Sequence, residues 1–172
     1  GPLALHHTLA QGASFPIFEV DTHNVVPVWV ASDKQEVGAR TLRPKIHRLL
    51  ADYLVEPPRP LHHPYAWKGP IIKVSQLSIH IQEILDAQPS NGQSLTFESG
   101  EQAAHVALQE FIKTRLKSYS DDRNDPTKDG LSGLSPYLHF GQLSSLRVAL
   151  EAPTAEVLIE EMIVRKELSD NF

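Results

Sequence analysis

The chain has 172 residues, of which 41% are hydrophobic and 22% charged, and its formal net charge is −5. This composition is typical of a folded globular protein and excludes an intrinsically disordered one. Because the chain has no cysteine, it has no disulfide, no thiol nucleophile and no cysteine-ligated zinc site. The acidic balance is not that of a dedicated nucleic-acid-binding protein, so any such surface must be local.

No apolar run is long enough to span a membrane, and the N-terminal sequence GPLALHHTLAQ lacks the regions of a secretory signal. We therefore expect an intracellular protein that is not bound to a membrane, in a compartment that the sequence does not identify. The chain begins without an initiator Met and ends abruptly at SDNF, which suggests a segment of a longer protein.

The first third of the chain is predicted to combine a strand with a helix. The sequence SFPIFEVD over residues 14–21 has the aromatic and β-branched composition of a short buried strand. Residues 22–30 are predicted to continue as an extended connection that Pro27 interrupts. A helix is expected over residues 32–54, with Ser32 as its N-cap and a break at Pro44.

A proline-rich stretch, EPPRPLHHPYAWKGP, follows over residues 56–70 and predicts an extended linker. Beyond it the pattern is helical. A short helix is expected over residues 78–88, and a longer one over residues 99–119 with Ser99 as its N-cap. The apolar residues of the longer helix recur at a spacing of 3.6; they are Leu108, Phe111, Ile112, Leu116 and Tyr119.

The C-terminal third is predicted to hold three further helices after a polar loop over residues 121–130. Ser135 followed by Pro136 is a strong helix start, since proline is tolerated at the first helical position. Ser144 is expected to cap a helix that ends before Pro153, and Thr154 a last helix over residues 155–169.

The stretch GLSGLSPYLHFGQLS, residues 130–144, has no charged side chain although it follows a highly charged loop. Gly130 and Gly133 allow tight turns and close approach of a ligand, and Ser132 and Ser135 offer hydroxyl groups. Free N–H groups at the start of the following helix would then cradle a phosphate or a pyrophosphate. The alternative is a capped helix–turn–helix that binds nothing.

The last predicted helix carries a carboxylate and a guanidinium within its apolar face. At 100° per residue, Glu161 and Arg165 fall inside the arc of apolar residues, whereas Glu160, Lys166 and Glu167 fall on the solvent side. Such charges are either paired with each other at i,i+4 or directed into a ligand cavity. The nine histidines form no metal-binding pattern, and no nucleotide-binding or hydrolase motif is present.

Three blocks of the sequence resemble, in this order, blocks of the class II cyclobutane pyrimidine dimer photolyases. The blocks are EVDTHNVVPVWVASDKQEVGARTLRPKI, RNDPTKDGLSGLSPYLHFGQLS and EEMIVRKELSDNF. The resemblance implies a mainly α fold that is the start of the helical FAD-binding domain, preceded by the end of an α/β Rossmann-like domain. It places the α/β part at residues 1–55, a Pro-rich linker at 56–75 and the incomplete helical domain at 76–172.

The resemblance also implies a function, namely light-dependent DNA repair. In this family, photoexcited reduced FAD donates an electron to a pyrimidine dimer that is flipped out of damaged DNA. A second, antenna chromophore is possible, and the full-length protein is expected to be a monomer.

The site residues carry over by position. Tyr119 and Arg165 match residues at the flavin, and Leu131, Ser132, Gly133, Leu134 and Ser135 match the loop that holds the FAD pyrophosphate. Glu161 matches the catalytic carboxylate that hydrogen-bonds the dimer. Arg123, Val164 and Arg165 match positions on the DNA side.

The sequence departs from the family pattern in three ways. Val164 stands where many photolyases have tryptophan, so no stacking platform for the dimer exists there. The stretch from Ser144 to Glu161 is shorter than its counterpart, and the family's remaining flavin-facing residues would lie beyond Phe172. We therefore expect the segment alone to be inactive and poorly soluble.

Three other interpretations stay open. The protein could be a cryptochrome-like flavin photoreceptor without repair activity, or an inactive truncated gene product. From the helical pattern alone, it could be an interaction module.

Overall fold

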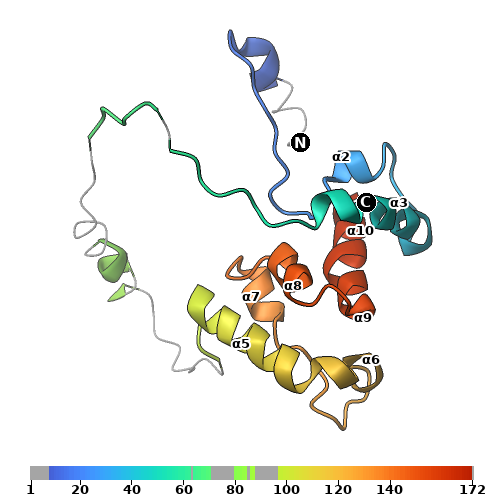
Figure 1. Cartoon of the computed structure of the whole chain (residues 1–172). Coiled ribbons are helices and arrows are strands. Elements are labelled where there is room, and N and C mark those ends of the chain that lie inside the picture. Colours follow the sequence, from blue (N-terminus) through green and yellow to red (C-terminus); the bar gives the residue numbers. More distant parts are fainter. Residues whose placement is uncertain (1–7, 63, 71–79, 85, 88–96, 172) are drawn as a thin grey trace. The chain divides into compact units, whose positions relative to one another are not determined.

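The computed structural model describes residues 8–62, 64–70, 80–84, 86–87 and 97–171 (Figure 1). The chain divides into two units. One comprises Gly1–Glu56 together with Gly100–Phe172, and the other comprises Pro57–Ser99. In the described residues there is no strand, and no helix is long and apolar enough to cross a membrane.

The first unit is helical, which confirms the prediction of a mainly α fold. Residues 8–12 are helical, and the elements that follow in chain order are α2 Val28–Ala31, α3 Ala39–Tyr53, α5 Glu101–Thr114, the 3₁₀-helix η1 Leu116–Ser118, α6 Tyr119–Asp122, α7 Ser135–His139, α8 Ser145–Glu151, α9 Glu156–Ile159, the π-helix η2 Glu160–Arg165 and α10 Lys166–Asn171.

Two apolar clusters form the core of this unit. One joins α5, α7, α8 and α9, with Phe111, Leu134 and Leu158 at its centre and fully buried. The other joins α2 and α3 to α8, η2 and α10, and there Leu42 and Ile46 pack with Ile163 and Val164. Figure 1 shows α2 and α3 beside α10, although more than a hundred residues separate them in the chain.

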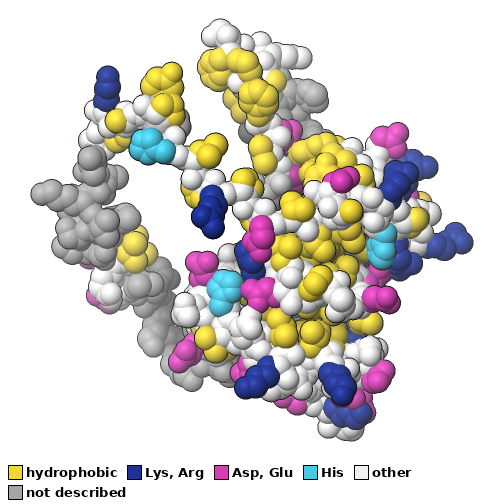
Figure 2. Space-filling model, in the orientation of Figure 1, with side chains coloured by type: hydrophobic (Ala, Val, Ile, Leu, Met, Phe, Trp, Pro, Cys, Tyr) yellow, Lys and Arg dark blue, Asp and Glu magenta, His cyan; other side chains and the backbone are white. Residues whose placement is uncertain are grey.

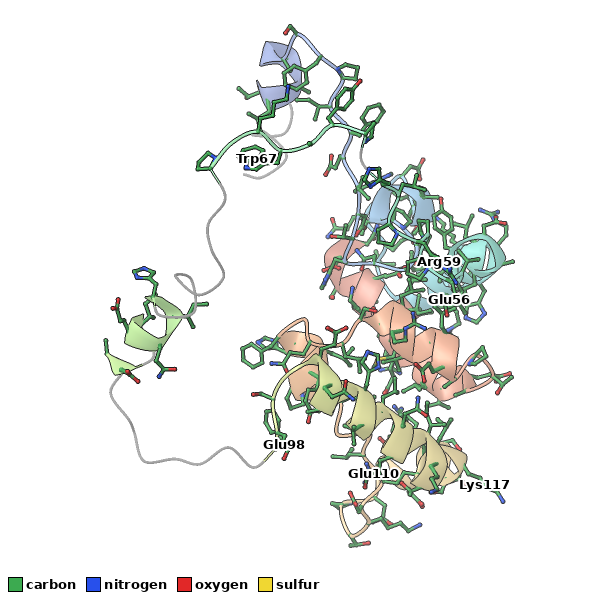
Figure 3. All side chains as sticks on the ribbon, turned by 60° about the vertical axis from the view of Figure 1, so that its left-hand side comes forward. Glu56, Arg59, Trp67, Glu98, Glu110 and Lys117 are labelled. Atoms are coloured by element: carbon green, nitrogen blue, oxygen red, sulfur yellow. The ribbon has the colours of Figure 1, made fainter. Side chains whose placement is uncertain are left out.

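The second apolar cluster contains residues from two of the predicted domains. The described residues of 1–55 contribute no strand, and they share this core with residues from 76–172. The predicted Rossmann-like part is therefore not seen here, and the division into domains stays a prediction. Within the second unit, the described residues 57–70 contain neither helix nor strand, and the Trp67 indole donates to the Pro70 carbonyl at 3.2 Å (Figure 3).

Two predictions for the N-terminal part are wrong. Residues 14–21 form no strand: Phe15, Phe18 and Val20 are 68%, 85% and 73% exposed, and no described segment pairs with them. A strand requires a partner for its backbone N–H and C=O groups, which composition alone does not supply. The connection after it is not extended throughout, because Val28–Ala31 forms the short helix α2.

Helix α3 differs from the prediction at its start and at its proline. It begins at Ala39 after Gly38, so Ser32 is not its N-cap. The Ser32 hydroxyl instead donates to Glu36 at 2.7 Å and accepts from Lys45 at 2.9 Å. Pro44 lies inside α3 without ending it, since burial of the flanking apolar side chains outweighs the lost hydrogen bond.

The predicted helix over 99–119 is divided in the structure. Its α-helical part begins at Glu101 after Gly100, whose φ of 105° suits glycine, and whose N–H donates to the Gln142 side chain at 2.9 Å. Ser99 is therefore not the N-cap, and Tyr119 lies in the separate helix α6, which also takes in the first two residues of the predicted polar loop. Of the helix expected over 78–88, residues 78, 79, 85 and 88 lie outside the described residues, and 80–84 and 86 are helical.

The helix starts in the C-terminal third are partly confirmed. Ser144 caps α8 as predicted, accepting from the Arg147 N–H at 3.1 Å, and α8 ends before Pro153. Ser135 is the first residue of α7 and not its N-cap, which is Leu134. The last helix likewise begins after Ala155 and not after Thr154.

The last predicted helix contains a π-helical segment, and this changes which side chains face the core. η2 has more residues per turn than an α-helix, so the constant step of 100° fails across it. Glu167, predicted on the solvent side, is 1% exposed, whereas Arg165, predicted within the apolar face, is exposed.

Candidate functional site

Three of the predicted site residues meet at the start of η2. The Tyr119 hydroxyl donates to Glu161 Oε2 at 2.7 Å, and Arg123 forms an ion pair with Glu161 Oε1. The Arg123 guanidinium also lies 5.9 Å from the centre of the Tyr119 ring, a cation–π distance. Phe111 packs against the Tyr119 ring in an edge-on contact with 5.2 Å between ring centroids.

This arrangement excludes one alternative for Glu161. It makes no ion pair with Arg165 in the described residues, so the i,i+4 pair that the sequence allowed does not form. The Glu161 side chain keeps about 25% of its surface exposed. Since an ionised carboxylate has about four acceptor positions, two remain for a further donor.

Glu161 lies on two hollows of the first unit. The loop hollow has a volume of about 700 Å³ and is lined by Ser135, His139, Ser145, Glu161 and Lys166, among others. The arginine hollow has a volume of about 630 Å³ and is lined by Arg43, His47, Arg123, Glu160, Glu161 and Arg165, among others. Glu161 thus borders one hollow that Ser135 of the predicted phosphate loop also lines, and a second hollow that is lined by basic side chains.

The predicted phosphate loop borders the loop hollow through Ser135. Leu134 is fully buried and anchors the loop, while Leu131, Gly133 and Ser135 are exposed. Gly133 has φ of 71°, in the left-handed region that glycine adopts without strain.

The loop amides are largely unengaged. Leu134 N–H donates to the Ser132 hydroxyl at 3.4 Å, whereas the amides of Leu131, Ser132, Gly133 and Ser135 make no hydrogen bond among the described residues. Gly130 is buried, and a side chain there would meet the Asp122 carbonyl at 2.5 Å. Its close approach is therefore to the backbone of α6 and not to a ligand.

The remaining predicted residues lie apart from the loop hollow. Tyr119 does not line the loop hollow, although its hydroxyl donates to Glu161, which does. Arg165 lies on the arginine hollow. Val164 is fully buried in the core cluster that includes α3 and lines neither hollow, and its match to a DNA-side position stays a prediction.

Sequence reasoning missed two residues of the arginine hollow. Arg43 of α3 makes a forked contact with Glu160, from Nε to Oε2 at 2.8 Å and from Nη2 to Oε1 at 2.6 Å. The hydrogen bonds from Arg43 hold the pKa of Glu160 below its usual range. No local signal could have revealed this pair, because its members are 117 positions apart.

Charges of both signs are mixed over the helical unit, as Figure 2 shows, and no face visible there is uniformly basic. Within the described part of the chain, no group of His, Asp and Glu side chains is arranged to hold a metal ion. The positive charge of the arginine hollow is therefore a local feature, balanced by the glutamates beside it.

No protein-family model matches the chain. Several curated relatives are named deoxyribodipyrimidine photo-lyase. The one from Potorous tridactylus is 40% identical over 192 residues, which cover 98% of this chain and 34% of the relative. That from Arabidopsis thaliana is 44% identical over 180 residues, 92% of this chain and 35% of the relative. That from Methanothermobacter thermautotrophicus is 38% identical over 173 residues, 95% of this chain and 37% of the relative.

The chain thus spans about a third of the length of these relatives. Their identity extends over more than nine tenths of this chain and confirms the resemblance to photolyases, although it does not distinguish the class II subtype. By this similarity, the chain belongs to the family of the deoxyribodipyrimidine photo-lyases.

Proposed function

We propose that the complete gene product is a light-driven DNA repair lyase of the class II type. It would hold FAD, with a possible second antenna chromophore, and split cyclobutane pyrimidine dimers in UV-damaged DNA. The observation that carries the proposal is the position of Glu161, which borders both the loop hollow and the arginine hollow. From this position the Glu161 carboxyl group can hydrogen-bond a dimer that is brought within electron-transfer distance of the cofactor.

The loop of Leu131, Ser132, Gly133, Leu134 and Ser135 fits the pyrophosphate of FAD. Four of its amides have no hydrogen-bond partner among the described residues, and backbone N–H groups of this kind bind phosphate oxygens well. The buried Leu134 side chain fixes the loop, and Ser135 borders the loop hollow. When bound, FAD supplies the electron that photoexcitation releases.

The arginine hollow fits the DNA side. Arg165 is exposed there and Arg123 lies beside it, so both can approach a DNA phosphate or the lesion. Tyr119 and Arg123 fix the orientation of Glu161 and leave part of its carboxylate available to hydrogen-bond the dimer. Since Val164 is buried, the proposal assigns it no stacking on the dimer.

The proposal can be tested by replacing Glu161 with alanine in the complete gene product. The substitution removes the carboxylate but none of the loop amides. Repair per absorbed photon should therefore fall by about tenfold or more, as expected for loss of a positioned polar group, while the flavin bands in the near-ultraviolet and blue stay unchanged. The measurement is light-dependent loss of dimers from irradiated DNA.

The matched control is Glu110→Ala, since Glu110 is an exposed glutamate of α5 (Figure 3). It should leave both flavin content and repair unchanged. A folded wild-type protein without flavin bands would contradict the proposal. Bound flavin without dimer repair in the wild-type protein would instead indicate a photoreceptor.

A further inference from the structure

Two consecutive glutamates at the start of η2 are held by arginines from different helical regions. Glu160 is held by Arg43 of α3 through two hydrogen bonds of 2.8 and 2.6 Å. Glu161 is held by Arg123, just after α6, and by the Tyr119 hydroxyl. The two pairs lie on the same arginine hollow, and the short backbone link between the glutamates couples them mechanically.

The pair of Arg43 and Glu160 has the geometry of a specific contact. Two guanidinium donors each reach a different carboxylate oxygen, Nε to Oε2 and Nη2 to Oε1, an arrangement that fixes orientation as well as distance. The Glu160 side chain is only 19% exposed. A single surface ion pair with lysine would impose far less geometry.

Helix α3 is itself held against η2 by apolar packing. Leu42 and Ile46, on either side of Arg43, are fully buried and share a cluster with Ile163 and Val164 of η2. Arg43 therefore extends from a support that is fixed relative to the π-helical segment. Its contact with Glu160 can therefore hold the start of η2 in place, and with it the neighbouring Glu161.

The π-helical segment needs such support. Six residues, Glu160–Arg165, adopt this conformation, which is rare and is maintained only where surrounding contacts favour it. A change of the segment to an α-helix would alter the turn per residue and so rotate Glu161 relative to Tyr119. The contact that holds the first residue of the segment is therefore well placed to prevent this rotation.

We propose that Arg43 is a positioning residue, which acts through Glu160 to fix Glu161 between the loop hollow and the arginine hollow. This inference rests on the proposed function, because Glu161 is taken as the catalytic carboxylate. Arg43 itself need not touch the dimer. Its effect is on where the Glu161 carboxylate lies when the dimer is bound.

The test compares Arg43→Gln, Arg43→Lys, Glu160→Gln and the double variant Arg43→Gln/Glu160→Gln in the complete gene product. Repair per absorbed photon is measured with substrate saturating, and the Kd for dimer-containing DNA is measured separately. Arg43→Gln and Glu160→Gln should each lower repair about tenfold, the scale expected for a displaced catalytic group. The Kd should change less than twofold, and flavin content should not change.

The repair activity of the double variant distinguishes one shared contact between Arg43 and Glu160 from two separate effects. The double variant should repair no worse than either single variant, because both remove the same contact. Arg43→Lys keeps the positive charge but cannot make the two parallel hydrogen bonds, so its repair should lie between that of Arg43→Gln and that of the wild type. Arg40→Gln is the matched control, since Arg40 is exposed on the same helix and outside the arginine hollow; it should match the wild type.

Four results would overturn the inference. Wild-type repair in both single variants would show that the pair of Arg43 and Glu160 has no role in positioning Glu161. A raised Kd with unchanged repair at saturation would make Arg43 a DNA contact, and a lowered Tm with unchanged repair would make the pair structural only. A wild-type protein that repairs nothing would refute the proposed function, and this role with it, whereas a defect confined to the variants leaves the function intact.

Discussion

Glu167 offers the most quantitative prediction for the stability of the helical unit. Its side chain is 1% exposed, and Oε1 accepts from the N–H groups of Val25 and Val26 at 2.8 and 3.0 Å. Oε2 is buried without a hydrogen-bond partner among the described residues. Burial therefore raises the pKa of Glu167 to about 7, although the two backbone bonds and the nearby Lys166 favour the charged form.

The direction of the pH effect follows from this raised pKa. The folded protein binds the Glu167 proton more tightly than the unfolded chain, whose pKa is 4.5. The resulting stabilisation is fully present below pH 4.5 and is lost as the pH rises through about 7. The interval between the two pKa values corresponds to about 3 kcal/mol of unfolding free energy, at 1.36 kcal/mol for each tenfold change in proton affinity.

Replacing Glu167 with glutamine removes the titration and keeps an oxygen for the amides of Val25 and Val26. At pH 5 the variant should be less stable than the wild type by about 1–3 kcal/mol, because the new amide N–H groups are buried without acceptors. Between pH 5 and 8.5 the difference should shift in favour of the variant by up to about 3 kcal/mol. For a unit of this size the shift amounts to roughly 6–12 °C in Tm.

The assay is thermal unfolding of both proteins at several pH values from 5 to 8.5. Only the difference between the two Tm values is interpreted, because other groups titrate in both proteins. Glu110→Gln, at an exposed position, should show a constant difference from the wild type. If the difference for Glu167→Gln were also constant across this range, the carboxyl would be ionised throughout and the reasoning would be wrong.

Three further substitutions test the loop and the helix starts. Ser135→Trp should fill the border of the loop hollow and weaken flavin retention, measured as the ratio of blue to ultraviolet absorbance after gel filtration; unchanged retention would place the cofactor elsewhere. Leu134→Ala should lower the unfolding free energy by about 2–5 kcal/mol, because the side chain is fully buried. The same change at the exposed Leu131 should cost little, and equal losses at both positions would contradict the packing of the loop. Ser144→Ala should cost about 1 kcal/mol in denaturant unfolding through loss of the α8 cap, whereas Ser144→Thr should keep most of it; no loss in the alanine variant would mean that the cap does not stabilise α8.

The sequence predicted local features well where one residue determines them. Ser144 caps its helix because its hydroxyl needs only the backbone three residues on. The turn at Gly133 is predictable from sequence because glycine adopts its φ of 71° without strain, whereas the binding of a phosphate there stays a prediction. The resemblance to photolyases singled out Tyr119, Arg123 and Glu161, and the structure brings the three together.

Features that depend on distant packing were not predictable from the pattern. Pro44 remains inside α3 because of apolar contacts that the local sequence does not reveal. A constant helical step predicts Glu167 on the solvent side, but residues 160–165 are π-helical and Glu167 is buried. The pair of Arg43 and Glu160 required the fold, since no rule of spacing connects residues 117 positions apart.

The hydrogen bonds from Val25 and Val26 to Glu167 join residues 142 and 141 positions apart, and this has a consequence for synthesis. At roughly 5–20 residues per second, a ribosome needs about 7–28 s to add the intervening residues. During that time the apolar side chains of α2 and α3 have left the exit tunnel without the partners that cover them. A chaperone that binds nascent chains would therefore be expected to engage residues 25–46 before α10 emerges, and to release them once it has emerged.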